Sequence, residues 1–118
     1  MSYNVFSIRA GFESLRSLAN GAITGAYAAV GGPLENPVRL IHFVNNTDGD
    51  MIFSDDATDV DGKIFVPAQA QLIIDLTANQ TSPQGFYLPK GTQWYVKQST
   101  APTAGSVYIS VVYSMTTV

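Results

Sequence analysis

The chain has 118 residues, one histidine, no cysteine and a formal net charge of −3. This length predicts a single domain, and the lack of cysteine excludes both a disulfide framework and a thiolate metal site. Charged residues make up 13% of the chain, about half of the roughly 25% that is usual in globular proteins, so the surface is either rich in uncharged polar groups or covered by partners.

The N-terminal part of the chain has the weakest secondary-structure signal. Residues 1–13 are expected to form an arm or an edge strand, and residues 14–118 a single β-sandwich domain. Residues 12–19 fit both a helical face and an alternating strand. A strand is favoured because the segment is short for a helix and the neighbouring segments have β patterns.

Strand patterns with short turns continue to the end of the chain. The stretch from Val38 to Val44 is apolar on both faces, which predicts a central strand covered on both sides. A turn follows, with Asp48 and Gly49 at its tip. Further strands are expected at residues 23–30, 51–54, 63–66, 72–76, 86–88, 93–98 and 106–113.

These segments define the expected fold class. About eight strands are punctuated by glycine and proline at short intervals, with no helical periodicity between them. The sequence therefore predicts an all-β protein, an antiparallel β-sandwich or barrel of the jelly-roll kind.

Acidic residues gather in one segment, where six of the nine lie within positions 48–61. Calcium needs several converging oxygen ligands, and the weak candidates for such a site are Asp55, Asp59 and Asp61. The spacing fails the EF-hand pattern, because the first ligand position falls on Ala57 and the twelfth on Ala68. A solvated loop without metal is the favoured interpretation, since Asp and Gly dominate turns for backbone reasons alone.

The side chains that enzymes use are scarce. His42 lies in the middle of a predicted strand, so we expect a hydrogen-bonded histidine of the core or of an interface. A catalytic triad needs a nucleophile and an orienting acid beside the imidazole, and zinc needs more ligands than one histidine supplies. The glycines form no phosphate-binding or dinucleotide motif. We expect no catalytic residue, no cofactor and no enzymatic activity.

Aromatic and apolar residues outside the predicted core are candidate interface positions. Tyr87, Trp94 and Tyr95 can stack on sugars or on a partner surface, although such rings more often belong to the core. Three apolar residues of the N-terminal arm have no obvious place in an eight-stranded core, and we expect them to contact a neighbouring subunit: Val5, Phe6 and Ile8.

The sequence also predicts where the protein is made and which partners it does not bind. The first residues lack the basic and apolar regions of a signal peptide, and no apolar run approaches the roughly 20 residues of a membrane span. The basic residues are scattered singly along the chain. We expect synthesis in the cytoplasm, no membrane association and no binding to nucleic acid.

Several stretches taken in order resemble small all-β proteins encoded among the structural genes of tailed bacteriophages. The stretches are ITGAYAAVG at 23–31, VRLIHFVNNTDGD at 38–50, MIFS at 51–54, FVPA at 65–68, KGTQWYVK at 90–97 and GSVYI at 105–109. The likeness covers most of residues 14–113 and is a pattern of strands and turns, so no functional residue is carried over from it.

The resemblance implies a structural protein of the virion, made in the host cytoplasm and forming a homo-oligomer. Capsid decoration, which cements the head, is favoured, and a head–tail connector or tail component is the alternative. The expected partners are capsid, portal or tail subunits. A carbohydrate-binding or host-recognition module is the alternative of another class, with Tyr87, Trp94 and Tyr95 as its sugar platform.

Overall fold

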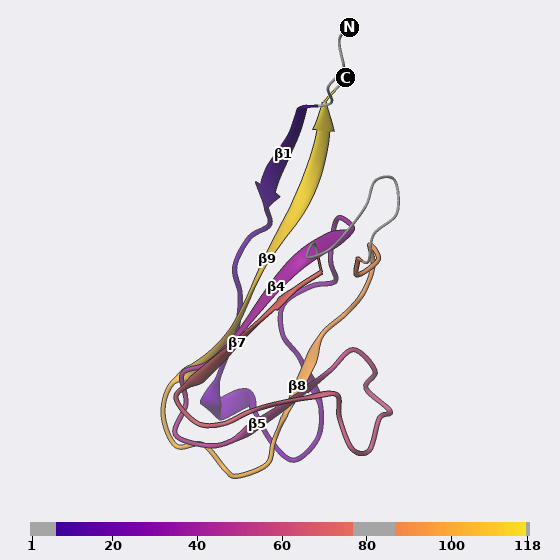
Figure 1. Ribbon diagram of the computed structural model, residues 1–118. Coiled ribbons are helices and arrows are strands. Elements are labelled where there is room, and N and C mark those ends of the chain that lie inside the picture. The colour runs from indigo at the N-terminus through magenta and orange to yellow at the C-terminus, as the bar shows by residue number, and fades with distance from the viewer. Residues whose placement is uncertain (1–6, 77–86, 118) are drawn as a thin grey trace, which may run out of the picture.

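The computed structural model describes residues 7–76 and 87–117 (Figure 1). Their regular structure is almost entirely β. The strands are β1 (Ser7–Phe12), β2 (Arg16–Ala19), β3 (Ala28–Ala29), β4 (Val38–Asn45), β5 (Met51–Ser54), β6 (Ile64–Val66), β7 (Ala70–Asp75), β8 (Tyr95–Gln98) and β9 (Ser106–Thr117), with one 3-10 turn at Asn20–Ala22. Within these described ranges, no helix is long and apolar enough to cross a membrane.

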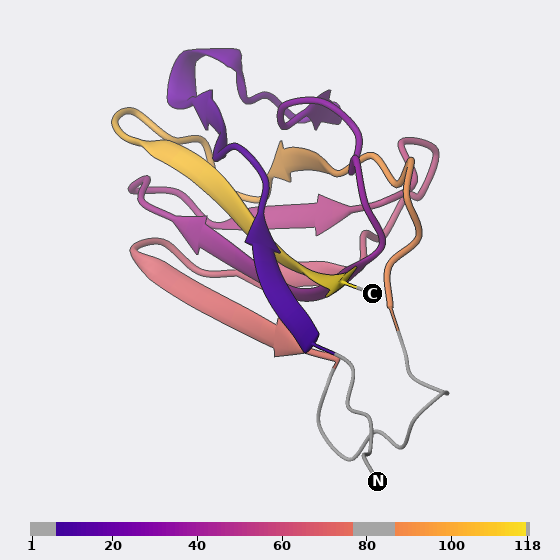
Figure 2. The same ribbon diagram turned by 90° about the horizontal axis from the view of Figure 1, so that it is seen from above.

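The strands form two antiparallel sheets that pack face to face. The first sheet has the order β1-β9-β4-β7, with β2 also paired to β9, and the second has the order β3-β8-β5-β6. Figure 2 shows β9, β4 and β7 side by side in the first sheet. The predicted all-β antiparallel sandwich is confirmed.

The pairing explains the jelly-roll character of the fold. β5 pairs with β6, β4 with β7, β3 with β8 and β2 with β9. The chain therefore folds as one long antiparallel hairpin, whose closing turn joins β5 to β6. Successive pairs of the hairpin alternate between the two sheets, which is the arrangement of a jelly roll.

The core lies between the sheets and follows the period-2 alternation of the strands. Phe43 of β4 contacts Phe53 of β5 and Trp94, each with ring centroids 5.0 Å apart. Burying one such ring contributes about 1.5–3 kcal/mol. β9 adds three inward side chains, so that both sheets are tied to one core: Val107, Ile109 and Val111.

Some strands differ locally from the predicted ones. Phe12 and residues 16–19 lie in strands, as favoured, whereas residues 13–15 have no regular structure and separate β1 from β2. β3 has only two residues, and Leu88 forms a single bridge to Val38. The expectation that both faces of β4 are covered is wrong within this chain, because Leu40, His42 and Val44 on the outer face remain partly exposed.

Strand β9 continues beyond the sandwich. It pairs with β4 only as far as Tyr113, whereas its pairing with β1 runs on to Thr117 opposite Ser7. Figure 1 shows β1 and the end of β9 extending past the other strands, and the molecule measures 59 × 24 × 23 Å. We call residues 7–10 and 114–117 the ribbon, because these residues pair only with each other among those described.

Candidate functional site

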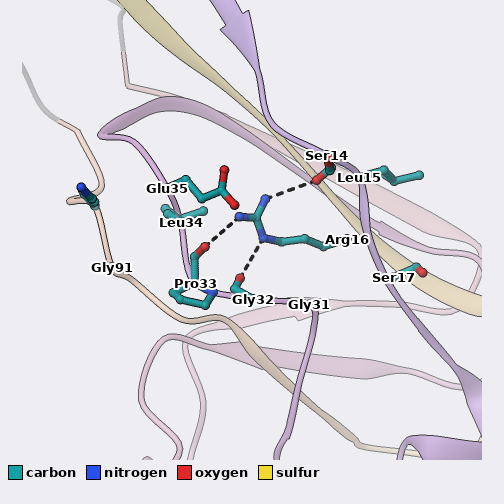
Figure 3. Close-up of a pocket in the computed structure, with 11 residues that line it drawn as sticks. Ser14, Leu15, Arg16, Ser17, Gly31, Gly32, Pro33, Leu34, Glu35 and Gly91 are labelled. Atoms are coloured by element: carbon teal, nitrogen blue, oxygen red, sulfur yellow. Dashed lines mark hydrogen bonds between the residues drawn. The ribbon is translucent and has the colours of Figure 1, made fainter.

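An ion pair between Glu13 and Arg16 fixes the connection between β1 and β2. Arg16 Nη2 lies 2.7 Å from Glu13 Oε1, and both side chains are buried. Arg16 also donates from Nε to the Gly32 carbonyl (2.9 Å), from Nη2 to the Pro33 carbonyl (2.9 Å) and from Nη1 to the Ser14 carbonyl (3.4 Å), as Figure 3 shows. The guanidinium thus joins the β1–β2 connection to the loop before β4.

The carboxylate of Glu13 is equally well bound on its other side. It accepts from the Glu35 backbone N–H at 3.1 and 3.2 Å and from Asn36 Nδ2 at 3.0 Å. Burial alone would raise the pKa of Glu13, but the hydrogen bonds from Arg16, Asn36 and Glu35 outweigh it and lower the pKa. The charges of Glu13 and Arg16 are therefore compensated by each other and by hydrogen bonds within the chain. We call this pair the clamp.

The clamp requires a glycine beside it. Gly31 has a φ of +67°, a backbone conformation that favours glycine. A Cβ at this position would also lie 2.6 Å from Arg16 Cγ. Both the backbone conformation and the space therefore keep the loop close to the arginine.

A shallow groove of about 820 Å³ lies beside the clamp. Its walls are largely apolar, and Leu15 is 61% exposed there. Concave, mostly apolar surfaces of roughly 300–1,000 Å³ are typical binding sites. The groove is lined by Ser14, Leu15, Arg16, Ser17, Gly31, Gly32, Pro33, Leu34, Glu35, Lys90 and Gly91.

The acidic loop, residues 55–62, gathers around a lysine. Lys63 Nζ lies 3.5 Å from Asp55 and 3.6 Å from Asp59, and the nearby carboxylate of Asp55 raises the pKa of Lys63. Asp59 also accepts from the Asp61 backbone N–H at 3.2 Å. The structure therefore brings Asp55 and Asp59 to an ammonium group, and no cluster of three possible metal ligands occurs in the described part of the chain.

The predicted aromatic platform is not assembled. Trp94 is only 5% exposed and belongs to the core, so its prediction as an interface residue is corrected. Tyr87 is exposed. Tyr95 is partly buried and meets Tyr27 edge-on, with centroids 6.4 Å apart. A flat sugar platform needs neighbouring exposed rings, and the burial of the indole removes its central member.

The candidate residues of the N-terminal arm divide at the start of β1. Val5 and Phe6 lie outside the described residues, whereas Ile8 lies in β1 opposite Thr116 of β9. His42 is hydrogen-bonded, as predicted, with its Nε2 2.7 Å from Gln71 Oε1. It lies on the outer face of the first sheet and is partly exposed, so it is not a core residue of this chain, and its place in an interface stays a prediction.

The outer face of the first sheet carries apolar side chains that the sequence reading placed under cover. Paired residues of an antiparallel sheet share a face. Val112 is therefore flanked by Phe12 and Leu40, and Tyr108 lies beside Val44. Ile73 pairs with His42 in the same sheet. We call this surface the outer patch: Phe12, Leu40, Val44, Ile73, Tyr108 and Val112.

Exposure within the outer patch is greatest toward its edges. Phe12 is 74% exposed and Ile73 is 56% exposed. The signal for this surface was present in the sequence as the second apolar face of residues 38–44. The clamp had no such signal, because Glu13 and Arg16 are three residues apart in a segment that fitted helix and strand equally.

Comparisons with protein-family models, curated proteins and solved structures found no match to this chain.

Proposed function

We propose that this protein is a non-enzymatic structural component of a tailed-phage particle, and that it decorates the capsid and stabilises the head. The observation that carries the proposal is the outer patch. Soluble monomers rarely keep large contiguous apolar surfaces exposed, and such surfaces mark interaction sites. A partner that covers the patch supplies the layer that the two-sheet fold does not provide.

The sparse charge supports the same proposal. Interface centres are depleted in charged residues and enriched in aromatic ones. The outer patch carries Phe12 and Tyr108, and one charged residue, Asp75 of β7, pairs with Leu40 at its edge. His42 at the centre of the patch is hydrogen-bonded to Gln71. The resemblance to proteins encoded among phage structural genes indicates that the partners are capsid subunits or further copies of this chain.

A head–tail connector or tail component is the second candidate, and the ribbon favours it. The two strands of the ribbon have outer edges that pair with no other strand among the described residues, and a strand edge can add to a neighbour's sheet. Subunits of a ring make such contacts with their neighbours in turn. Carbohydrate recognition is not proposed, because the burial of Trp94 removes the ring on which it depended.

Copy number in purified particles separates the two placements. Quantified electrophoresis of the phage that encodes this chain should find on the order of hundreds of copies if the protein decorates a symmetric capsid, and a single ring of copies if it belongs to the neck or tail. Absence of the protein from purified particles would refute both.

Variants of the outer patch test the surface itself. Phe12→Ser and Ile73→Ser should reduce incorporation into particles while changing the free energy of unfolding by no more than about 0.5 kcal/mol, as is usual for surface substitutions. The matched control is Val60→Ser, since Val60 is 81% exposed and lies on the acidic loop, away from the patch. Equal incorporation of all three variants would count against the outer patch as the interface.

A further inference from the structure

Residues 1–6 join the described part of the chain at the tip of the ribbon. Residues 1–6, with the sequence MSYNVF, precede Ser7, and Ser7 lies at the tip of the ribbon, opposite Thr117. The segment has no charged side chain, and Tyr3, Val5 and Phe6 give it a largely apolar character. From here on, the arm denotes only residues 1–6, the part of the predicted N-terminal arm that precedes β1.

The groove lies at the opposite end of β1 from the arm. Its lining begins at Ser14, two residues after β1 ends. β1 alone runs for about 17 Å from Ser7 to Phe12, and Ser14 lies two residues further on. Six residues span at most about 20–22 Å when fully extended. A reversal of direction uses at least about two of them, and the remaining four, about 14 Å at most, are shorter than β1. The arm of one chain therefore cannot fill the groove of the same chain.

The groove suits a largely apolar segment, although the charged residues Arg16, Glu35 and Lys90 belong to its lining. Arg16 donates to four oxygen atoms of its own chain, so it has little capacity left for an anionic ligand. Leu15 and Pro33 offer apolar surface, and Gly32 and Gly91 bring the backbone close without side chains. A volume of about 820 Å³ is of the size that accommodates a few large side chains.

We propose that the arm of one copy lies in the groove of a second copy, so that copies of the chain associate head to tail. The contact is heterologous, because the two copies contribute different surfaces, and it generates a closed ring or an open filament. The inference rests on the proposed function only in requiring that the protein assembles with itself.

The lack of cysteine allows a direct test by cross-linking in the full-length chain. Val5→Cys and Leu15→Cys proteins are mixed and treated with a short bis-maleimide linker, because a direct disulfide needs Cα atoms within about 7 Å. We expect a covalent dimer that contains one chain of each kind. The matched control replaces Leu15→Cys with Val60→Cys, which is also exposed but lies on the acidic loop. Equal yields from the two mixtures would overturn the proposal.

The double variant Val5→Cys/Leu15→Cys separates exchange between chains from folding back within a chain. The proposal predicts a ladder of cross-linked dimers and higher oligomers. The ladder should persist when the protein is diluted so far that chance encounters between chains no longer produce cross-links. A cross-linked monomer alone would mean that the arm reaches its own groove, which would overturn the proposal.

Removal of residues 1–6 provides an independent readout. Light scattering should find that the full chain gains mass with concentration and that the truncated chain loses this association, with an unchanged thermal unfolding midpoint. A full chain that is monomeric throughout would refute the inference. Cross-linking without incorporation into particles would refute only the proposed function. Incorporation into particles with Leu15→Cys linked to another protein would refute only the inference.

Discussion

Replacing Asn45 with alanine should be among the most destabilising single changes in this domain. The residue ends β4 with its side chain fully buried between the sheets. Its Nδ2 donates to the carbonyl oxygens of Gly49 (2.8 Å), Val66 (3.0 Å) and Pro67 (3.1 Å). Its Oδ1 accepts from the Thr47 N–H (3.0 Å) and from the Thr47 hydroxyl (2.6 Å). One amide thus joins the β4–β5 turn to the β6–β7 turn.

The magnitude follows from which groups keep a partner. In Asn45→Ala the Gly49 carbonyl retains the Thr47 hydroxyl (2.9 Å), and the Pro67 carbonyl retains the Ala70 N–H (3.1 Å). The buried Thr47 N–H loses its acceptor. An orphaned buried donor costs about 1–3 kcal/mol, and the weakened carbonyl contacts add to it, so we expect a loss of about 3 kcal/mol in the free energy of unfolding.

For a chain of 118 residues, the unfolding entropy is about 0.25 kcal/mol/K, so this loss corresponds to a fall in Tm of about 12 °C. Urea unfolding followed by the fluorescence of the single tryptophan, Trp94, measures it directly, because that indole lies in the core. Asn46→Ala is the control, since Asn46 is exposed and should change stability by no more than about 0.5 kcal/mol. A loss below about 1 kcal/mol in Asn45→Ala would refute the reasoning.

Three further predictions concern acid, backbone strain and metal. Glu13 and Asp48 both have lowered pKa values, so their contribution is present above about pH 4 and is lost as the pH falls; Glu13→Gln and Asp48→Asn should each flatten the acid limb of a Tm-against-pH curve. Gly105→Ala should cost at least about 2 kcal/mol, because Gly105 has a φ of +90° and an added Cβ would meet a backbone carbonyl, whereas Gly21→Ala, with nothing within 4 Å, should be nearly neutral in the same melt. A chelator should leave Tm unchanged, because Lys63 already lies among the carboxylates of the acidic loop, and a drop of several degrees would indicate a bound cation.

The sequence predicted those strands best whose alternation is strongest. β4 and β5 were placed to within a residue, because side chains of period 2 must face one core. β9 was expected to end at Tyr113 and continues to Thr117. Its last residues pair with β1 and lie past the last pairing with β4, so its hydrophobic pattern did not mark the end.

The candidate site could not be predicted, because it depends on how the paired strands fold into two sheets and bring distant loops together. Glu13 and Arg16 are near in sequence, but their other partners come from residues 32–36. Nothing local to residues 13–16 indicates that those groups will be neighbours. The prediction that Trp94 is an interface residue was wrong for a related reason. A single aromatic residue fits a core or a surface equally well, and only the packing against Phe43 decides between them.

The wrong prediction about β4 is informative about function. Residues 38–44 are apolar on both faces, and a strand with that pattern is usually covered on both sides. In the two-sheet sandwich the face of β4 that carries Ile41 and Phe43 is buried. The other face of β4 is not covered by the second sheet. Apolar residues on that second face are not required by the fold of the monomer, and keeping them exposed carries a risk of aggregation. Their retention is explained if a second protein surface supplies the missing layer, so the place where the strand pattern exceeds the needs of the fold is also where a partner is expected.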